Sequence, residues 1–564
     1  MNPLHKLQML AQVIKWRMTW DKKDLDYRVR GIDNPKFMSP REAAKHIPDN
    51  CVLFTSGMAG NTRPSVIYWA IRDRFLTEQH PRGITHVTVG AQGSRGRVPG
   101  TMEEIALDGL CERYIGGHLE TAKAQLKLAD QGKLKLHTMA QGIQCFLLEA
   151  MAQGKEYIEH TTGVDTFLDP RVGTGTAVAA TREPGYSEAA GDKLRYRLPK
   201  IDVAAFTIPA CDREGNLYIK GACLHTEAYY SALAAKANGG IVMASPAMVI
   251  EKDPANIFLP ADKVDIICVH PYNEQTGSVA QRKAWKMFTQ GAHEDLEASI
   301  NKLRYANQIL KITPLRGEVE NSLARMGANV FTRYAKRGAN IVVGVGLPEE
   351  VSRLIYQGGL FDQVQFISET GVMGGLPAPG IFFGIQINPT KIVTSTEIFH
   401  YCYKNLDVAL LGLLEADSQG NVNVSKRGEG AINYVGPGGF PDFCMAAKTI
   451  IFVGSWMAHS RMRLDNGTLI FEKRGECKFK DKVEEVTFSG RQALKQGKNV
   501  LYVTNVGVFK LTEEGMTLME VMPGVDIRKD ILDGCPMKVV LPKGEVPLVR
   551  TDVVTGKGFR LSFD

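Results

Sequence analysis

A single carboxylate stands where an apolar run enters a glycine-rich turn. The segment QFISETGVMGG covers residues 365–375, and only Ser368 separates Glu369 from its apolar part. A strand of this kind keeps water away from the carboxylate, which raises both its pKa and its reactivity. The glycines that follow leave room for another molecule to come close to the backbone: Gly371, Gly374 and Gly375. Glu369 is therefore a candidate for chemistry.

A second glycine loop could assist it. NYVGPGGFPDF (residues 433–443) holds Gly436, Gly438 and Gly439, whose backbone N–H groups could point at a developing oxyanion. A desolvated glutamate beside such a loop acts as a base, or it attacks a carbonyl and forms an acyl anhydride. The attack needs a very good leaving group, which a thioester supplies. A simpler interpretation stays open, in which Glu369 caps a helix or pairs with a surface lysine and the loop is only a turn.

Both loops belong to a chain that repeats itself. Four landmarks recur in the same order, each an apolar run followed by a turn. The pairs are residues 51–71 with 340–356, 85–93 with 364–372, 209–219 with 414–424, and 239–245 with 448–455. Short β-rich runs alternate with helical patterns throughout, which is typical of α/β proteins with parallel sheets. We expect two homologous open α/β domains fused in one chain.

The repeat also sets Glu369 apart. In the first copy, the corresponding position holds Gly90, Ala91 or Gln92, depending on the alignment. If the carboxylate only completed the fold, both copies would be expected to carry one. The predicted organisation is a helical extension over 1–40, a first half over 41–312 and a second half over 313–564 that carries Glu369. Glycine turns at the carboxyl ends of parallel strands are where such sheets bind ligands.

Composition narrows the class of protein. The chain has 564 residues and a formal net charge of +7, from 68 basic and 61 acidic residues without a long basic block. Nucleic acid is not an expected partner, whereas a small anionic molecule is. No run reaches the length of a membrane span, so we expect no stable membrane insertion. The basic, amphipathic start, LHKLQMLAQVIKWRMTW, is interpreted as a helix packed on the body or on a partner subunit, with a transit peptide or a membrane-surface helix as the alternative.

The ten cysteines are scattered, and none forms a C-x-x-C pair. Many lie in apolar runs, as Cys268 does. This pattern predicts reduced thiols in the core of a cytoplasmic protein, rather than a disulfide framework or a zinc site.

At this point the motifs resemble those of a known family. S-E-T-G at 368–371, G-G at 374–375 and G-x-G-G-F at 436–440 are similar to the glutamate-nucleophile (class I) CoA-transferases. Within that family, the chain most resembles the single-chain acetate/propionate enzymes, in which two homologous halves are fused. Weaker matches in the same order extend the resemblance from about residue 40 to the end: residues 140–143, 163–171, 211–215, 488–494 and 519–533.

The resemblance implies the fold shared with sugar-phosphate isomerases and a ping-pong transfer of CoA from an acyl-CoA to a free carboxylic acid. Glu369 would be the nucleophile and would carry a glutamyl-CoA thioester. The acids would be short- or medium-chain, with acetate, propionate or a 3-oxoacid in the expected range. No metal and no cofactor are implied, because CoA is a substrate. The resemblance also implies a homo-oligomer, a dimer or a tetramer.

Further site residues come from the same resemblance. Gly438 and Gly439 match the glycine pair whose amides stabilise the oxyanion, and Gly371 belongs to the nucleophile turn. The loop from Gly57 to Asn61, with Ser65, matches the segment that faces the glutamate from the other half. Gln141 and Gly142 match residues of the acyl pocket. Simpler roles stay open for three of these residues: Asn61 could only cap a helix, and Gln141 and Gly142 could only end a strand.

Two stretches depart from the family pattern. HYCYKN (residues 400–405) stands where relatives have consecutive glycines, and VGTGTAVAATREP (172–184) replaces a lysine-bearing G-G-K. Bulky groups here are expected to alter the acyl pocket. His400 could be a base, but packing or hydrogen bonding is favoured because the anhydride route needs no base.

Three other classes of function remain as alternatives. An acyl-CoA hydrolase would use the same glutamate with water as the acceptor. A ligand sensor or a sugar-phosphate isomerase would use the glycine turns only to hold phosphate. A dinucleotide-binding oxidoreductase is suggested by GVGLPE (344–349), but the third glycine of its motif is absent.

Overall fold

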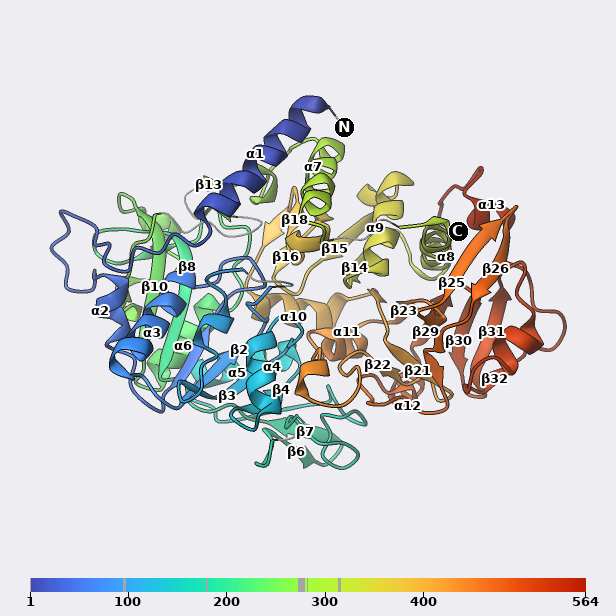
Figure 1. Ribbon diagram of the computed structural model, residues 1–564, viewed down its shortest axis with the longest axis horizontal. Helices are drawn as coiled ribbons and strands as arrows, with labels where there is room; N and C mark the ends of the chain where they lie inside the picture. The colour runs from blue at the N-terminus through green and yellow to red at the C-terminus, as the bar shows by residue number, and fades with distance from the viewer. Residues whose placement is uncertain are drawn as a thin grey trace.

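The computed structural model describes residues 2–94, 98–178, 181–271, 279–280, 283–312 and 316–563. None of the helices in these ranges combines the length and the hydrophobicity that a membrane-spanning helix needs. Two large sheets, one from each half of the chain, form the framework (Figure 1).

The first half folds around an eight-stranded sheet in the described part of the chain. Its central strands are parallel and largely buried, as their runs of apolar residues predict. Along the sheet, the order is β11-β10-β8-β1-β2-β3-β4, with β9 (Leu217–Tyr218) paired to β8. The strands of this path are β1 (Val52–Thr55), β2 (Ile84–Thr88), β3 (Cys111–Gly116), β4 (Lys135–Thr138), β8 (Val203–Cys211), β10 (Ile241–Val249) and β11 (Ile266–Ile267). The main helices are α3 (Ser65–Glu78), α4 (Lys123–Asp130), α5 (Gln141–Ala152) and α6 (Ala228–Ala237).

The second half builds a ten-stranded sheet from the residues that the structure describes. Its order is β19-β16-β15-β14-β20-β23-β29-β30-β31-β32. The first six of these strands are β19 (Lys391–Ile392), β16 (Val372–Met373), β15 (Val364–Ile367), β14 (Ala339–Val343), β20 (Val408–Leu411) and β23 (Thr449–Val453). The other four are β29 (Asn499–Thr504), β30 (Gly507–Thr512), β31 (Gly515–Val521) and β32 (Val539–Val540). The helices of this half include α8 (Glu318–Tyr334), α9 (Leu347–Gln357), α10 (Ser395–Asn405) and α11 (Phe440–Ala446).

The internal repeat is visible in strand order. The four adjacent parallel strands β2-β1-β8-β10 of the first sheet correspond to β15-β14-β20-β23 of the second. The D-x-x-G-N landmark also forms the same turn twice. The Asp212 carboxylate accepts the Asn216 side-chain amide at 2.7 Å, and the Asp417 carboxylate accepts that of Asn421 at 3.0 Å. Two α/β halves of related build therefore make up the chain, as predicted.

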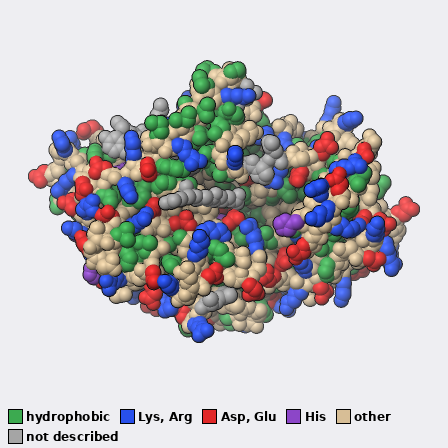
Figure 2. Space-filling model, in the orientation of Figure 1, with side chains coloured by type: hydrophobic (Ala, Val, Ile, Leu, Met, Phe, Trp, Pro, Cys, Tyr) green, Lys and Arg blue, Asp and Glu red, His purple; other side chains and the backbone are tan. Residues whose placement is uncertain are grey.

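The N-terminal segment forms α1 (Pro3–Thr19), which lies beside α7 (Leu296–Ile309) at the top of Figure 1. Trp16 is buried and stacks on Trp285 with ring centroids 5.8 Å apart. The opposite side of α1 is apolar and open to solvent, with exposed side chains at Leu4, Leu7, Ile14 and Met18. Figure 2 shows apolar side chains gathered over this end of the molecule, while side chains of both charge signs are spread over the rest of the face.

The predicted boundary between the halves, at 312/313, falls at residues 313–315, which lie outside the described residues. The boundaries stay a prediction. Contacts between the halves are formed by α5, which packs on α10 and on α11.

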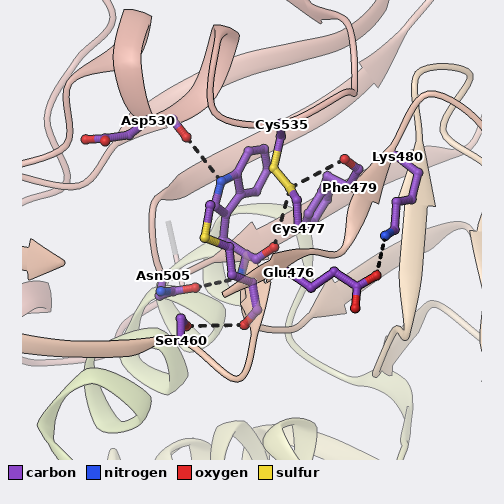
Figure 3. The surroundings of a disulfide bond; sticks show 10 residues. Ser460, Glu476, Cys477, Phe479, Lys480, Asn505, Asp530 and Cys535 are labelled. Atoms are coloured by element: carbon purple, nitrogen blue, oxygen red, sulfur yellow. Dashed lines mark hydrogen bonds and ion pairs between the residues drawn. A yellow bond between two sulfur atoms is a disulfide. The ribbon is translucent and has the colours of Figure 1, made fainter. Parts of the chain in front are cut away.

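The cysteine prediction is wrong at one pair. Cys477, in the short strand β27 (Glu476–Cys477), forms a disulfide with Cys535 (Figure 3). The other eight cysteines are buried and outside any disulfide, as predicted for core thiols. The Cys477 sulfur lies 3.9 Å from the Trp456 carbonyl oxygen, and the Trp456 indole N–H donates to the Asp530 carbonyl at 3.2 Å. The two cysteines are 58 residues apart, and the fold alone brings them together.

We expect this disulfide to stabilise the second half. Closing a loop of 58 residues restricts the unfolded chain, an effect of about 4 kcal/mol in the chain-entropy account. Replacing Cys477 and Cys535 by serine should therefore lower the unfolding temperature, and a reductant should lower that of the natural chain but not that of the double variant. Ten titratable thiols in the denatured, unreduced protein would contradict this assignment.

Candidate functional site

The turn that carries Glu369 is held by its neighbours on both sides. It follows β15 and is closed by the Gly371 amide, which donates to the Ser368 carbonyl at 3.0 Å. The hydroxyls of Ser368 and Thr370 both donate to the carbonyl of Gly384. The Glu369 side chain is half-buried, and no residue that the structure describes hydrogen-bonds it. The turn is thus fixed while its carboxylate stays unengaged.

Gly371 lets the turn fit its surroundings. Its φ of +95° lies in the left-handed region, and a Cβ atom at this position would stand 1.9 Å from the Val393 carbonyl oxygen. The Val393 amide donates back to the Gly371 carbonyl at 2.9 Å. The Glu369 turn is therefore packed backbone to backbone against the residues that lead into α10.

The first half meets this turn through the loop that contains Gly57 and Asn61. The Asn61 side-chain amide donates to the Phe383 carbonyl at 3.4 Å. Beside it, Met58 reaches the position next to Gly384. Because Gly384 also anchors Ser368 and Thr370, the loop predicted to face the glutamate lies against the Glu369 turn.

Ser65, at the start of α3, is placed differently. Its hydroxyl accepts the Arg63 Nε–H at 3.1 Å and donates to the Gly100 carbonyl at 2.5 Å. Ser65 is buried and supports the Arg63 side chain. The structure does not bring its hydroxyl to Glu369 through any contact among the described residues.

The second glycine loop joins the start of α5. The Gln141 amide donates to the Gly438 carbonyl at 3.0 Å, and the Gly438 amide donates to the Gly117 carbonyl at 2.8 Å. The Gly142 amide donates to the Asp442 carboxylate at 2.8 Å. These predicted residues from the two halves are thus brought together. The Gly438 N–H is thus already bonded. The Gly439 N–H, in contrast, has no hydrogen-bond acceptor within the described chain.

Two further carboxylates accompany Glu369. Burial, followed by charge repulsion from Asp442 and Glu227, raises the pKa of Glu369 to about 7. Burial likewise raises the pKa of Glu227 and that of Asp442 to about 7. Neither Glu227 nor Asp442 was predicted from the sequence, because each stands at the start of a helix, where an acidic residue is routine. GGFPDF carried a weak signal for Asp442, three residues after Gly439.

His400 makes the packing contacts that were favoured for it. Its ring stacks on Phe146 with centroids 4.5 Å apart, and its Nε2 lies 2.7 Å from a Glu149 carboxylate oxygen. HYCYKN forms the end of α10, where the Tyr403 hydroxyl donates to Asp442 at 3.1 Å. In the other departing stretch, residues 179 and 180 lie outside the described residues. Among the described residues, no group of His, Cys, Asp and Glu side chains could hold a metal ion.

Comparison with known proteins defines the class. The chain is 32% identical over 511 residues to caffeate CoA-transferase of Acetobacterium woodii, covering 88% of this chain and 93% of that protein. It is 30% identical over 511 residues to acetate CoA-transferase YdiF of Escherichia coli (strain K12), covering 88% of this chain and 91% of that protein. The chain therefore belongs to the CoA-transferase family, although no family model matches it.

A solved structure extends the likeness to the fold. It is acyl-CoA transferase YdiF of E. coli O157:H7, as a thioester complex with CoA, with a TM-score of 0.81 and 28% identity. The match covers 93% of this chain and 97% of that chain. The protein is a CoA-transferase enzyme that passes CoA between an acyl-CoA and a carboxylic acid.

Proposed function

We propose that the transfer runs through a glutamyl-CoA thioester on Glu369. The supporting observation is the side chain itself: it is half-buried, unengaged in hydrogen bonds with described residues, and held on a turn that both halves contact. A structural carboxylate would be expected to use its oxygens as caps or ion pairs. Asp212 and Asp417, which do so, show the contrast within the same chain.

The proposed steps balance without a net proton. The Glu369 carboxylate attacks the thioester carbonyl, the C–S bond breaks, and a mixed anhydride and CoA thiolate form. The thiolate attacks the glutamyl carbonyl, and the donor acid leaves as a carboxylate. An acceptor carboxylate then attacks the glutamyl-CoA thioester, and the released thiolate takes the new acyl group from the anhydride. Free Glu369 is regenerated.

The chain offers groups for the other parts of the reaction. We propose Gly439 as an amide donor to the oxyanion, since the Gly438 amide is bonded to Gly117. A groove of about 600 Å³ could hold part of CoA, with Leu347, Ser455, Arg461 and Asn505 in its lining. Leu347 follows β14 and Ser455 follows β23, so the groove opens at the same sheet edge as Glu369. Arg461 supplies positive charge for phosphate there.

The acid substrate is proposed as a short- or medium-chain carboxylic acid, including acetate, propionate or a 3-oxoacid. The relatives carry names with two different acids, caffeate and acetate, so family membership alone does not define it. Hydrolysis of the same thioester is the second candidate. Release of CoA measured with and without an added carboxylic acid separates the two: transfer predicts release only with the acid, and hydrolysis predicts equal release in both.

The rate should depend on pH through Glu369. Only the ionised carboxylate attacks the thioester, and its pKa is raised to about 7. The ionised form therefore predominates above pH 7 and is replaced by the unreactive protonated form as the pH falls below that value. We expect kcat/KM for the acyl-CoA to fall about tenfold for each pH unit well below the pKa. Rates measured between pH 5 and 9 with a thioester that does not titrate would show this limb. A flat profile from pH 8 to pH 5 would contradict it.

A further inference from the structure

A buried glutamate outside the predicted site connects the two halves beside Glu369. Glu227, which precedes α6, is only 1% exposed. One of its carboxylate oxygens accepts the hydroxyl of Ser56 at 3.1 Å, and the other accepts that of Ser395 at 3.0 Å. Ser56 belongs to the first half, and Ser395 is the first residue of α10 in the second. Glu227 itself lies in the first half, so its hydrogen bond with Ser395 crosses the junction of the halves, while its hydrogen bond with Ser56 holds the loop that precedes Gly57.

Both ends of this connection lead to the Glu369 turn. Ser56 precedes Gly57, and Met58 in the loop that follows lies against Gly384. On the other side, Ser395 follows Val393, whose amide donates to the Gly371 carbonyl. The backbone repeats the link, because the Ser395 amide donates to the Thr226 carbonyl at 3.0 Å.

We propose that Glu227 is a positioning residue for the transfer reaction, which holds the Gly57 loop and the start of α10 in register around the Glu369 turn. This inference rests on the proposed role of Glu369. Burying a carboxylate is costly unless its oxygens are bonded, and the two serine hydroxyls meet that need. A neutral side chain could join two helices at lower cost. The negative charge of Glu227 has a second effect, because it repels the charge of the nearby Glu369 carboxylate.

The charges around the pair can be named. Glu369 is faced by Glu227, by Asp442 from α11 and by Cys402 from α10. Glu227 is faced by Glu369 and by Cys145 from α5. Both cysteines are buried thiols whose pKa is raised, so they are neutral at physiological pH. Among these neighbours, Asp442 and Glu227 are the ones whose negative charge raises the pKa of Glu369.

Two variants separate positioning from simple support. Glu227→Gln keeps the shape and removes the charge, so the acidic limb of kcat/KM should move to lower pH, by about half a unit or more. Glu227→Ala removes the hydrogen bonds as well, so kcat should fall by about 100-fold, while KM for the acyl-CoA changes little. Asp212→Asn is the matched control: it alters a buried carboxylate within one half and should leave the pH limb in place.

The outcomes distinguish this inference from the proposed function. If the natural chain forms no covalent CoA adduct, the proposed nucleophile role of Glu369 is contradicted, and the positioning role of Glu227 that rests on it is contradicted as well. If the adduct forms, an unmoved pH limb in Glu227→Gln together with a natural kcat in Glu227→Ala overturns the positioning role alone. A limb that moves equally in Asp212→Asn would likewise overturn it. A shifted limb in Glu227→Gln with a reduced kcat in Glu227→Ala supports it.

Discussion

Glu369→Ala should lower CoA transfer by about 10⁴-fold or more, because no other group would form the covalent intermediate. The carboxylate sits on a turn that is bonded through Ser368 and Thr370 rather than through itself. Its removal should therefore leave the fold intact. Steady-state transfer between an acyl-CoA and a free acid measures the loss, and an unchanged unfolding temperature shows that folding is not the cause.

Glu149→Ala is the matched control for this variant. Glu149 is also a half-buried glutamate near the junction, but it pairs with His400. We expect its replacement to leave kcat within about threefold of the natural value, as for a surface ion pair. Natural activity in Glu369→Ala would rule out the nucleophile. A large loss in Glu149→Ala would instead return His400 to consideration as a base.

Gly371→Ala should disable the same turn from the backbone side. A Cβ there would stand 1.9 Å from the Val393 carbonyl oxygen, and the φ of +95° disfavours any L side chain. The backbone of either segment must move, so we expect a loss of more than about 2 kcal/mol in the free energy of unfolding. A displaced Glu369 should also lower kcat by about 100-fold. Denaturant unfolding and steady-state kinetics measure the two effects.

The control for strain alone is Gly544→Ala. Gly544 has a φ of +105°, and a Cβ there would meet no atom within 4 Å. It shares the backbone conformation without the collision, so only the smaller cost of the conformation should appear. If Gly371→Ala destabilised the protein no more than Gly544→Ala, and kept full activity, the tight packing of the turn on Val393 would not matter to the reaction.

The sequence was informative where local pattern and internal repetition agree. The apolar run at 364–367 forms β15, and the glycines after it adopt the turn that their spacing indicated. Three of the four landmarks contain corresponding strands of the parallel sheets: β1 and β14, β2 and β15, and β10 and β23. The D-x-x-G-N landmark instead forms the turn that follows β8 in the first half and β20 in the second. Glu369 stood out for the same reason: the first copy of the turn has no carboxylate.

What the sequence could not show depends on long-range contacts. Glu227 and Asp442 are ordinary helix-start acids until folding buries them against residues from the other half. The disulfide joins Cys477 to Cys535 across 58 residues without any spacing signature, so the thiols were predicted to be reduced. The glycine pair at 438–439 was a match in sequence, but only the backbone hydrogen bonds show that the first amide is already bonded.

Intact mass measurement after incubation with an acyl-CoA tests the nucleophile most directly. We expect the natural chain to gain the mass of CoA less one water, borohydride to remove that adduct, and peptide mapping to place it on Glu369. The gain should be absent in Glu369→Ala and present in Glu149→Ala. A catalytically active chain that gains no mass with any of a panel of C2 to C6 acyl-CoAs, or that carries the adduct on another residue, would contradict the proposed mechanism.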